Sequence, residues 1–399
     1  MSDTPNTPFS AAASLSGYLF QCRYALLESL RRLRTSDGFI VSIETLDDVT
    51  FETRGEAPEL LQTKHHLNRS ADLTDASTDL WKTLRVWAEG LAGGLPDGTT
   101  FFLITTSVAP AGSAAHYLKP GPSRDPVKAG ERLESTARTS TNKDNAKAYE
   151  AYTNLKTDVR ERMLSAAVVI DGVPPLGDLD AELREVVFYA VEQKYLESYL
   201  QRLEGWWLRR AIRHLTSEDS APILSEELAA ETAALREQFK QDSLPVDDDI
   251  MQAFVDASGY QDKAFVHQLR LLGVGGPRIL HAIRHFFRAF EQRSRWLRED
   301  LLLVGELDRY EDHLVEEWDI MFQRMRENLG EEEAEEVKRA AARALYEWVE
   351  TWPHRPIRGG VTEPSIARGS YHMLADERRV GWHPEFVERL KALLEPQEA

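Results

Sequence analysis

The spacing of apolar residues changes repeatedly over the first hundred positions, and this pattern predicts a mixed α/β region. Across residues 11–34 they recur every three or four positions, which is typical of an amphipathic helix. Turn residues then separate three short runs rich in β-branched and apolar residues, which predict an antiparallel meander over 39–45, 48–53 and 59–66. A helical pattern at 70–94 precedes a continuous apolar run at 99–107, which is typical of a buried strand. The predicted order is α-β-β-β-α-β.

The rest of the chain reads as mainly helical. Residues 108–148 show little periodicity and predict a long excursion with one helix, before a helix at 151–164 and a last strand at 166–173. The stretch "PPLGDLD" at 174–180 is the best linker candidate. Long amphipathic segments follow at 183–215, 222–244, 279–297 and 309–328. The predicted fold class is therefore α+β, with an N-terminal αβββαβ domain over 1–175 and an all-α domain over 178–399.

Composition limits the class of protein. The chain has 399 residues, 42% hydrophobic and 29% charged, as expected of a globular protein with two or three domains. It shows no apolar run long enough to span a membrane and no secretory signal pattern. Its single cysteine, Cys22, excludes an internal disulfide framework, so we expect a cytoplasmic protein. The net charge of −18 disfavours a DNA-coating surface, although basic segments occur locally.

Acidic and basic side chains gather around the predicted hairpin. Asp47 and Asp48 lie at the start of its first strand, Glu44 lies in the run before it, and Gln62 and Lys64 lie near the end of the next strand. In an antiparallel pair these two ends are adjacent, and residues two apart share a face, so we expect Asp48 beside Gln62 and Lys64.

This arrangement suits the hydrolysis of phosphodiesters. Carboxylate and carbonyl oxygens bind Mg²⁺, and an ammonium group stabilises negative charge in the transition state. Asp48, Gln62 and the backbone carbonyl of Thr63 are the predicted metal ligands. The alternative is an ordinary acidic turn beside an exposed strand-edge lysine, which is common in soluble proteins.

The segments "SGYLFQCRYAL", "IETLDDVTF" and "LLQTKHH" together resemble the Mrr-like branch of the PD-(D/E)xK nucleases. More narrowly, they resemble the nuclease domain of CBASS effectors and of ABC-three-component antiphage systems, which include Lamassu. The resemblance covers roughly residues 10–170 and implies a restriction-endonuclease-like fold and metal-dependent cleavage of double-stranded DNA with Mg²⁺ or Mn²⁺. It places the catalytic set at Gln21, Glu44, Asp48, Gln62 and Lys64, with Asp47 as the alternative to Asp48.

The segment 369–386, "GSYHMLADERRVGWHPEF", resembles the end of the helical C-terminal domain of effectors from ABC-three-component systems. This resemblance implies an SMC- or ABC-type ATPase and a small third component as partners. It further implies activation by release and self-assembly into a homotetramer. Two rival hypotheses are a stand-alone restriction-type nuclease acting on modified DNA and a catalytically idle scaffold.

Three further features have weaker implications. His65 and His66 follow Lys64 directly, and one of them could act as a base or contact a phosphate, although strand-end histidines are usually polar surface. His281 and His285 have a zinc-compatible spacing but lack a third ligand nearby, so a plain helix face is favoured. The glycines at 273–276 lack the strand and the Lys-Ser/Thr of a phosphate loop, so they predict a helix–helix turn.

Overall fold

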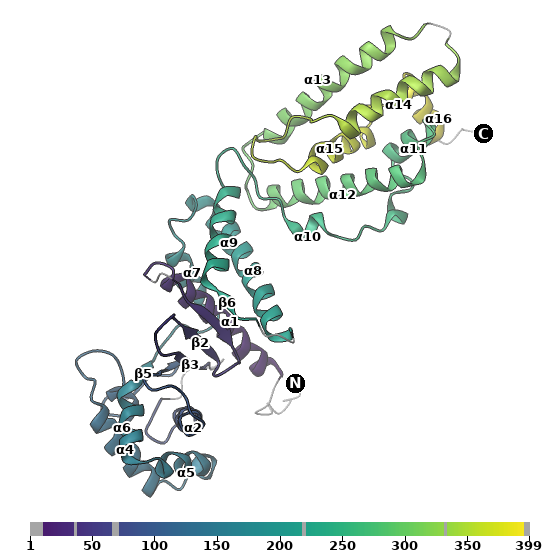
Figure 1. Ribbon diagram of the computed structural model, residues 1–399. Coiled ribbons are helices and arrows are strands. Elements are labelled where there is room, and N and C mark those ends of the chain that lie inside the picture. The colour runs from purple at the N-terminus through teal and green to yellow at the C-terminus, as the bar shows by residue number, and fades with distance from the viewer. Residues whose placement is uncertain (1–10, 36–37, 66–71, 218–220, 331–332, 395–399) are drawn as a thin grey trace, which may run out of the picture. The chain divides into compact units, whose positions relative to one another are not determined.

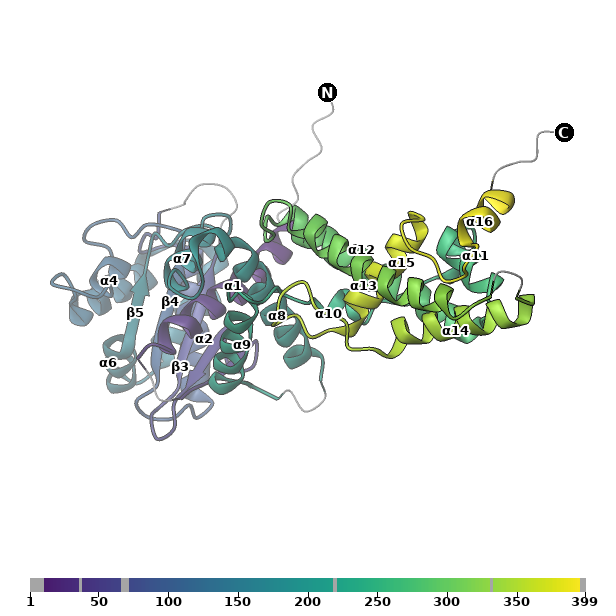
Figure 2. The ribbon, with the colours of Figure 1, turned by 90° about the horizontal axis from the view of Figure 1, so that it is seen from above.

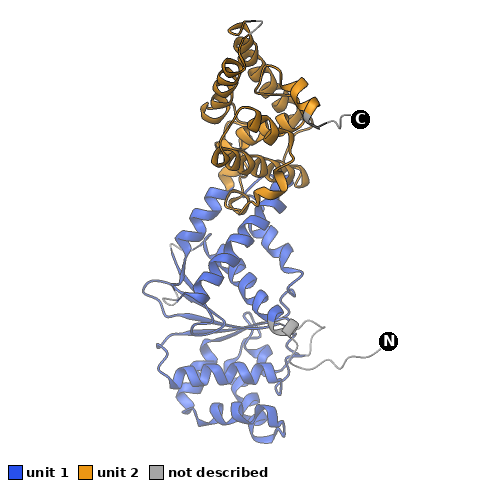
Figure 3. Ribbon diagram, turned by 90° about the vertical axis from the view of Figure 1, so that its right-hand side faces the viewer, with its two compact units in different colours: residues 1–235 blue, residues 236–399 orange. Residues whose placement is uncertain are grey.

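The structure is a computed structural model, and it describes residues 11–35, 38–65, 72–217, 221–330 and 333–394. The chain divides into two compact units, Met1–Leu235 and Arg236–Ala399 (Figure 3). The first unit is a mixed α/β layer structure, and the second is helical.

Six strands of the first unit form one sheet in the order β5-β4-β3-β2-β1-β6 (Figure 1). β1 (Ile40–Ile43), β2 (Val49–Glu52) and β3 (Glu59–Lys64) form the predicted antiparallel meander. β4 (Thr100–Thr105) and β5 (Ala167–Ile170) extend it in parallel with β3. The order α-β-β-β-α-β is thus present over α1 (Ala11–Arg32) to β4, with α2 at Thr78–Ala92.

Helices cover both faces of this sheet, which Figure 3 shows nearly edge-on. Leu60 of β3 belongs to the core that α2 and β4 share, and α1 packs near β1 and β3. Because side chains alternate along a strand, Gln62 and Lys64 lie on the same face as Leu60. The alternation of side chains along β3 therefore places the polar side chains of Gln62 and Lys64 together at the end of the strand.

The excursion after β4 contains more helix than the sequence predicted. It forms α3 (Ala114–Tyr117), α4 (Pro126–Thr139) and α5 (Ala146–Asn154), with a short 3₁₀ turn at Lys143–Asn145, and then α6 (Thr157–Ala166). The start of α4 has a clear local signal, because Asp125 caps the helix by accepting from the Lys128 N–H and Pro126 occupies its first turn. The weak apolar pattern hid these helices, since α4 buries few side chains.

The predicted domain boundary at 175–178 differs from the division into compact units. The predicted helix 183–215 is broken into α7 (Leu179–Val186), a 3₁₀ turn at Gln193–Tyr195 and α8 (Leu196–Thr216), while α9 is Ser225–Gln238. Both α7 and α8 pack on α1, and β6 (Ile223–Leu224) pairs with β1. The stretch 174–178 is thus a loop inside the first unit that leads into α7, and the second compact unit begins at Arg236. The local sequence pattern could not predict this boundary, because it depends on the contacts of α7, α8 and β6 with α1 and β1, which are distant in sequence.

The second unit packs its helices around one apolar core (Figures 1 and 2). Its long helices α12 (Gly276–Arg298), α13 (Glu306–Glu327) and α14 (Glu335–Thr351) lie alongside α15 (Pro364–Asp376). The shorter helices are α10 (Asp248–Met251), α11 (Ala264–Leu271), α16 (Phe386–Leu394) and a 3₁₀ turn at Ala257–Tyr260. Gly273 adopts a positive φ of 71° between α11 and α12, which confirms the predicted helix–helix turn.

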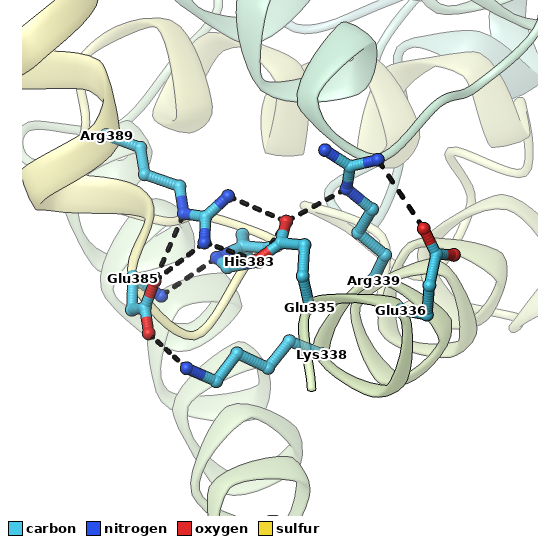
Figure 4. Close-up of polar contacts among 7 residues, drawn as sticks. All are labelled: Glu335, Glu336, Lys338, Arg339, His383, Glu385 and Arg389. Atoms are coloured by element: carbon cyan, nitrogen blue, oxygen red, sulfur yellow. Dashed lines mark hydrogen bonds and ion pairs between the residues drawn. The ribbon is translucent and has the colours of Figure 1, made fainter. Parts of the chain in front are cut away.

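A network of ion pairs joins α14 to α16 in this unit (Figure 4). Arg389 donates to both carboxylate oxygens of Glu335, at 2.8 and 2.6 Å, in the bidentate geometry that suits a guanidinium. Lys338 and Arg389 also donate to Glu385, and hydrogen bonds from these two cations lower the pKa of Glu385 to about 2. The last helix is thereby fixed by charge as well as by the burial of Phe386 and Leu390.

Candidate functional site

The register of β2 and β3 places Asp48 directly beside the end of β3. Val49 pairs with Leu61, so the next pair outward is Asp48 and Gln62. Gln62 Nε2 donates to Asp48 Oδ1 at 2.7 Å. The backbone N–H and the hydroxyl of Thr63 both donate to Asp48 Oδ2, at 2.7 and 3.0 Å. The Asp48 carboxylate is therefore held by the neighbouring strand at both oxygens.

Lys64 joins this cluster through Gln62. Lys64 Nζ donates to Gln62 Oε1 at 3.0 Å, so the amide of Gln62 lies between the ammonium group and the aspartates. Lys64 is half-buried and Gln62 is buried, which limits the conformations open to both. The expected proximity of Asp48, Gln62 and Lys64 is present in the structure.

Asp47 is the most deeply buried carboxylate of the site, with 7% of its surface exposed. Its Oδ1 accepts from the Asp48 N–H at 2.9 Å and from Gln62 Nε2, whereas Oδ2 has no hydrogen-bond partner. Burial raises the pKa of Asp47 to about 6, and the charge of Asp48 adds to this rise. The hydrogen bonds from Asp48 and Gln62 and the charge of Lys64 oppose it. These interactions compensate the charge of the buried Asp47 carboxylate only in part.

An apolar cavity of about 400 Å³ lies next to Asp47. Leu46 and Leu60 line it together with Trp87 and the turn after α2, through Gly93 and Pro96. These walls contribute few polar groups, which accounts for the desolvation of the Asp47 carboxyl.

Glu44 and Gln21 form the outer edge of the site. Glu44 has a positive φ of 55°, and its N–H donates to the Asp48 carbonyl at 3.0 Å, so the turn 44–48 closes on itself. Desolvation raises the pKa of Glu44, and the charge of Asp48 adds to this. A hydrogen bond with Gln21 and the charge of Lys64 oppose the rise. Gln21 is therefore close to Glu44, at the edge of the site.

A hard divalent cation bound at this site could not be held by carboxylates alone. Among the described residues, no group of three or more His, Cys, Asp or Glu side chains is arranged to hold a metal. A site here would combine aspartate oxygens with the Gln62 amide oxygen and the Thr63 carbonyl, all of which are ligands that Mg²⁺ accepts. The unpartnered, buried Asp47 Oδ2 fits such a cation, because it is an acceptor without a donor. Half a turn of the Gln62 amide would direct Oε1 toward the aspartates.

His65 does not face the aspartate cluster as a free base. Its Nε2 accepts from the Leu176 N–H at 3.1 Å, and its ring stacks on Phe20. His66 lies outside the described residues. On α12, His281 is exposed whereas burial lowers the pKa of His285 to about 4, and neither belongs to a metal-holding group in the described chain.

Comparison with known families concerns the second unit. Residues 265–390 match the family model of C-terminal domain 7 of the ABC-three component (ABC-3C) systems. The match runs from α11 to α16, so this part of the second unit is similar to a C-terminal domain of that type. The resemblance expected for the C-terminal segment is confirmed at this level. None of the curated proteins matches the chain.

Two solved structures show a weaker similarity. The Acinetobacter baumannii Cap4 SAVED/CARF-domain containing receptor with the cyclic trinucleotide 3'3'3'-cAAA is 12% identical over 69% of this chain and 66% of its own, with a TM-score of 0.35. The Moraxella osloensis Cap4 SAVED/CARF-domain containing receptor is 13% identical over 69% of this chain and 68% of its own, with a TM-score of 0.34. No property of this chain follows from likenesses of this size.

Membrane insertion has no support in the described part of the chain, where each helix is either too short or too polar to act as a membrane span.

Proposed function

We propose that this chain is a metal-dependent DNA endonuclease and the effector of an ABC-three-component antiphage system. The observation that carries the proposal is the contact series from Lys64 through Gln62 to Asp48, which is built on two adjacent strand ends. The family match of residues 265–390 supports the biological setting.

The chemistry assigns each residue a role. Asp48, Gln62 and the Thr63 carbonyl would hold Mg²⁺ or Mn²⁺, with Asp47 as a further oxygen donor; the bound cation supplies Lewis-acid activation of the phosphodiester and of water. Lys64 stabilises the negative charge that develops on the phosphate oxygens and orients the attacking water. In the arrangement without a cation, the Gln62 amide links Lys64 to the aspartates. Glu44 and Gln21 shape the edge of the site.

Its partners follow from the proposed setting. Double-stranded DNA is the substrate, and an SMC- or ABC-type ATPase with a small third component restrains the chain through the helical unit. Release permits assembly into a homotetramer, in which several weak DNA contacts add up to stronger binding. This suits a chain whose net charge of −18 gives one copy little attraction for phosphate.

Plasmid cleavage tests the proposal. The purified chain is assayed alone and together with its ATPase partner, with Mn²⁺, with Mg²⁺ and with a chelator. Lys64→Ala should abolish cleavage, whereas the matched control Lys147→Ala, an exposed lysine on α5, should retain it. Cleavage by Lys64→Ala at the wild-type rate, or wild-type cleavage in the chelator, would contradict the proposal. Cleavage by the lone chain only on methylated DNA would favour the restriction-type alternative.

A further inference from the structure

His65 occupies the position directly after Lys64, and contacts with Phe20, Ser16 and Leu176 hold its ring. The ring stacks on Phe20 of α1 with centroids 4.9 Å apart, and Nδ1 lies 3.5 Å from Ser16 Oγ. Nε2 accepts from the Leu176 N–H at 3.1 Å. An accepting nitrogen carries no proton, so the neutral ring holds its proton on Nδ1, toward Ser16. The ring thus connects the end of β3 to α1 and to the loop after β5.

Leu176 is held at its other polar atom as well. Arg23 NH1 donates to the Leu176 carbonyl at 2.9 Å. The same guanidinium donates through Nε to Glu204 of α8 at 2.6 Å and through NH2 to Asp180 of α7. The backbone of one loop residue, Leu176, is therefore clamped by His65 on the strand side and by Arg23 on the helix side.

This clamp has a direct consequence for Lys64. A lysine side chain has four flexible carbons, so the position of its ammonium group depends on a well-fixed backbone. Lys64 is the last residue of β3, where it pairs with Thr105 of β4, and the Thr106 N–H donates to its carbonyl at 3.3 Å. His65 adds a second anchor immediately beyond this pairing.

We propose that His65 is a positioning residue that fixes Lys64, and that the Leu176 clamp transmits displacements of α7 and α8 to the site. The expected effect on DNA cleavage rests on the proposed function. The claim that His65 fixes the position of Lys64 does not, because it concerns only how firmly the lysine is held. A partner that shifts α7 or α8 would loosen Lys64 through Arg23, Leu176 and His65 in turn.

Two substitutions at His65 separate its contacts. His65→Phe keeps an aromatic ring for Phe20 but removes the acceptor for Leu176. His65→Gln removes the ring but brings an amide oxygen near the place of Nε2. Arg23→Gln breaks the clamp from the helix side. Arg31→Gln is the matched control, because Arg31 also lies on α1 and pairs with α7, but its guanidinium contacts Glu28 and Glu182, at 2.8 and 2.6 Å, rather than Leu176.

The first readout needs no enzymatic activity. Acylation of Lys64 by an amine-reactive ester is followed by peptide mass spectrometry, with Lys147 as the internal reference, and amide exchange of Leu176 is measured in parallel. His65→Phe and Arg23→Gln should speed both reactions, whereas His65→Gln and Arg31→Gln should leave both close to wild type. Faster exchange at Leu176 with unchanged acylation of Lys64 would overturn the inference.

The second readout is DNA cleavage by the full chain. His65→Phe should lower kcat by about tenfold or more with little change in KM, because the misplaced ammonium group matters in the transition state. His65→Gln should restore most of kcat, which general destabilisation would not allow. Equal kcat for wild type and His65→Phe would reject the positioning role alone. A wild-type chain that cuts no DNA would reject the proposed function, and the acylation result would then decide the inference by itself.

Discussion

Asp48 and Thr63 are joined by two hydrogen bonds to a single carboxylate oxygen, one from the Thr63 N–H and one from its hydroxyl. The strand that carries Gln62 and Lys64 thereby orients the aspartate of the adjacent strand. An orientation set by backbone is more rigid than one set by side chains alone, which suits a residue that must meet a cation in a fixed geometry.

Replacing Asp48 with asparagine should remove metal binding while preserving the fold. The amide oxygen can still accept from Thr63, but the negative charge is lost. We expect the affinity for Mn²⁺ to fall by more than about 100-fold in a calorimetric titration. Asp97→Asn is the control, because the Asp97 side chain is 94% exposed in the same unit. Equal Mn²⁺ affinity in wild type and Asp48→Asn would contradict the assigned ligand.

Asp47→Asn should stabilise the metal-free protein at neutral pH. The folded-state pKa of about 6 lies above the ordinary value of 3.8, so the folded protein binds more protons than the unfolded chain between these values. The contribution of Asp47 to the free energy of unfolding therefore falls as pH rises from about 4 to 6. Above pH 6 the ionised Asp47 continues to destabilise the folded state. Removing this charge should raise the free energy of unfolding at pH 7 by up to about 3 kcal/mol. Urea unfolding at pH 4 and pH 7 measures this, and an equal effect at both values would contradict it.

Acid should destabilise the second unit through its buried histidines. Burial lowers the pKa of His285 to about 4 and of His372 to about 3, from an ordinary value of 6.5. The unfolded chain takes up protons first, so stability is present above pH 6.5 and is lost as pH falls toward these values, by about 1.4 kcal/mol per pH unit for each histidine.

The substitution that tests this dependence is His372→Phe. Phe265, Tyr346 and Trp382 surround His372, so an apolar ring fits the site. The loss of stability between pH 6.5 and 4.5 should be smaller in this variant, whereas the exposed His281→Phe should behave as wild type. Thermal unfolding across that pH range measures the difference, and parallel curves for all three proteins would exclude the mechanism.

Gly369→Ala should disrupt the crossing of α15 and α12. An added Cβ would lie 2.0 Å from the His285 carbonyl oxygen and 2.5 Å from the Ala289 Cβ, and a helix backbone cannot move aside cheaply. We expect a loss of more than about 3 kcal/mol in urea unfolding. Gly205→Ala, in the middle of α8 with its nearest contact at 3.6 Å, should instead gain roughly 1 kcal/mol. Similar stability for the two variants would refute the packing argument.

The sequence predicted the parts of this structure that depend on local geometry. The meander follows from alternation and turn residues, and the meeting of Asp48, Gln62 and Lys64 follows from the geometry of a hairpin with that register. The cation ligands and the cleavage chemistry remain predictions. The helical character of the C-terminal region was equally visible, because long amphipathic patterns are strong signals.

The features that the sequence did not predict depend on contacts between residues that are far apart in the chain. His65 looked like a surface residue or a base, because nothing in "QTKHH" points to Leu176. The local sequence does not distinguish Arg23 from the other polar positions of α1, although it binds a loop and two later helices. The raised pKa of Asp47 required knowledge of the apolar wall that α2 and Leu46 provide.

The pairing of Val41 with Ile223 bears on how this protein is made. During synthesis the ribosome must translate residue 224 before β1 can pair with β6. The nascent sheet therefore has β1 as an edge strand with unpaired backbone groups for much of translation. A recombinant fragment that ends at the apparent linker near 178 would lack β6, so β1 would remain an unpaired edge strand and the fragment should aggregate. One extended to about residue 240 would include α9 and should remain in solution.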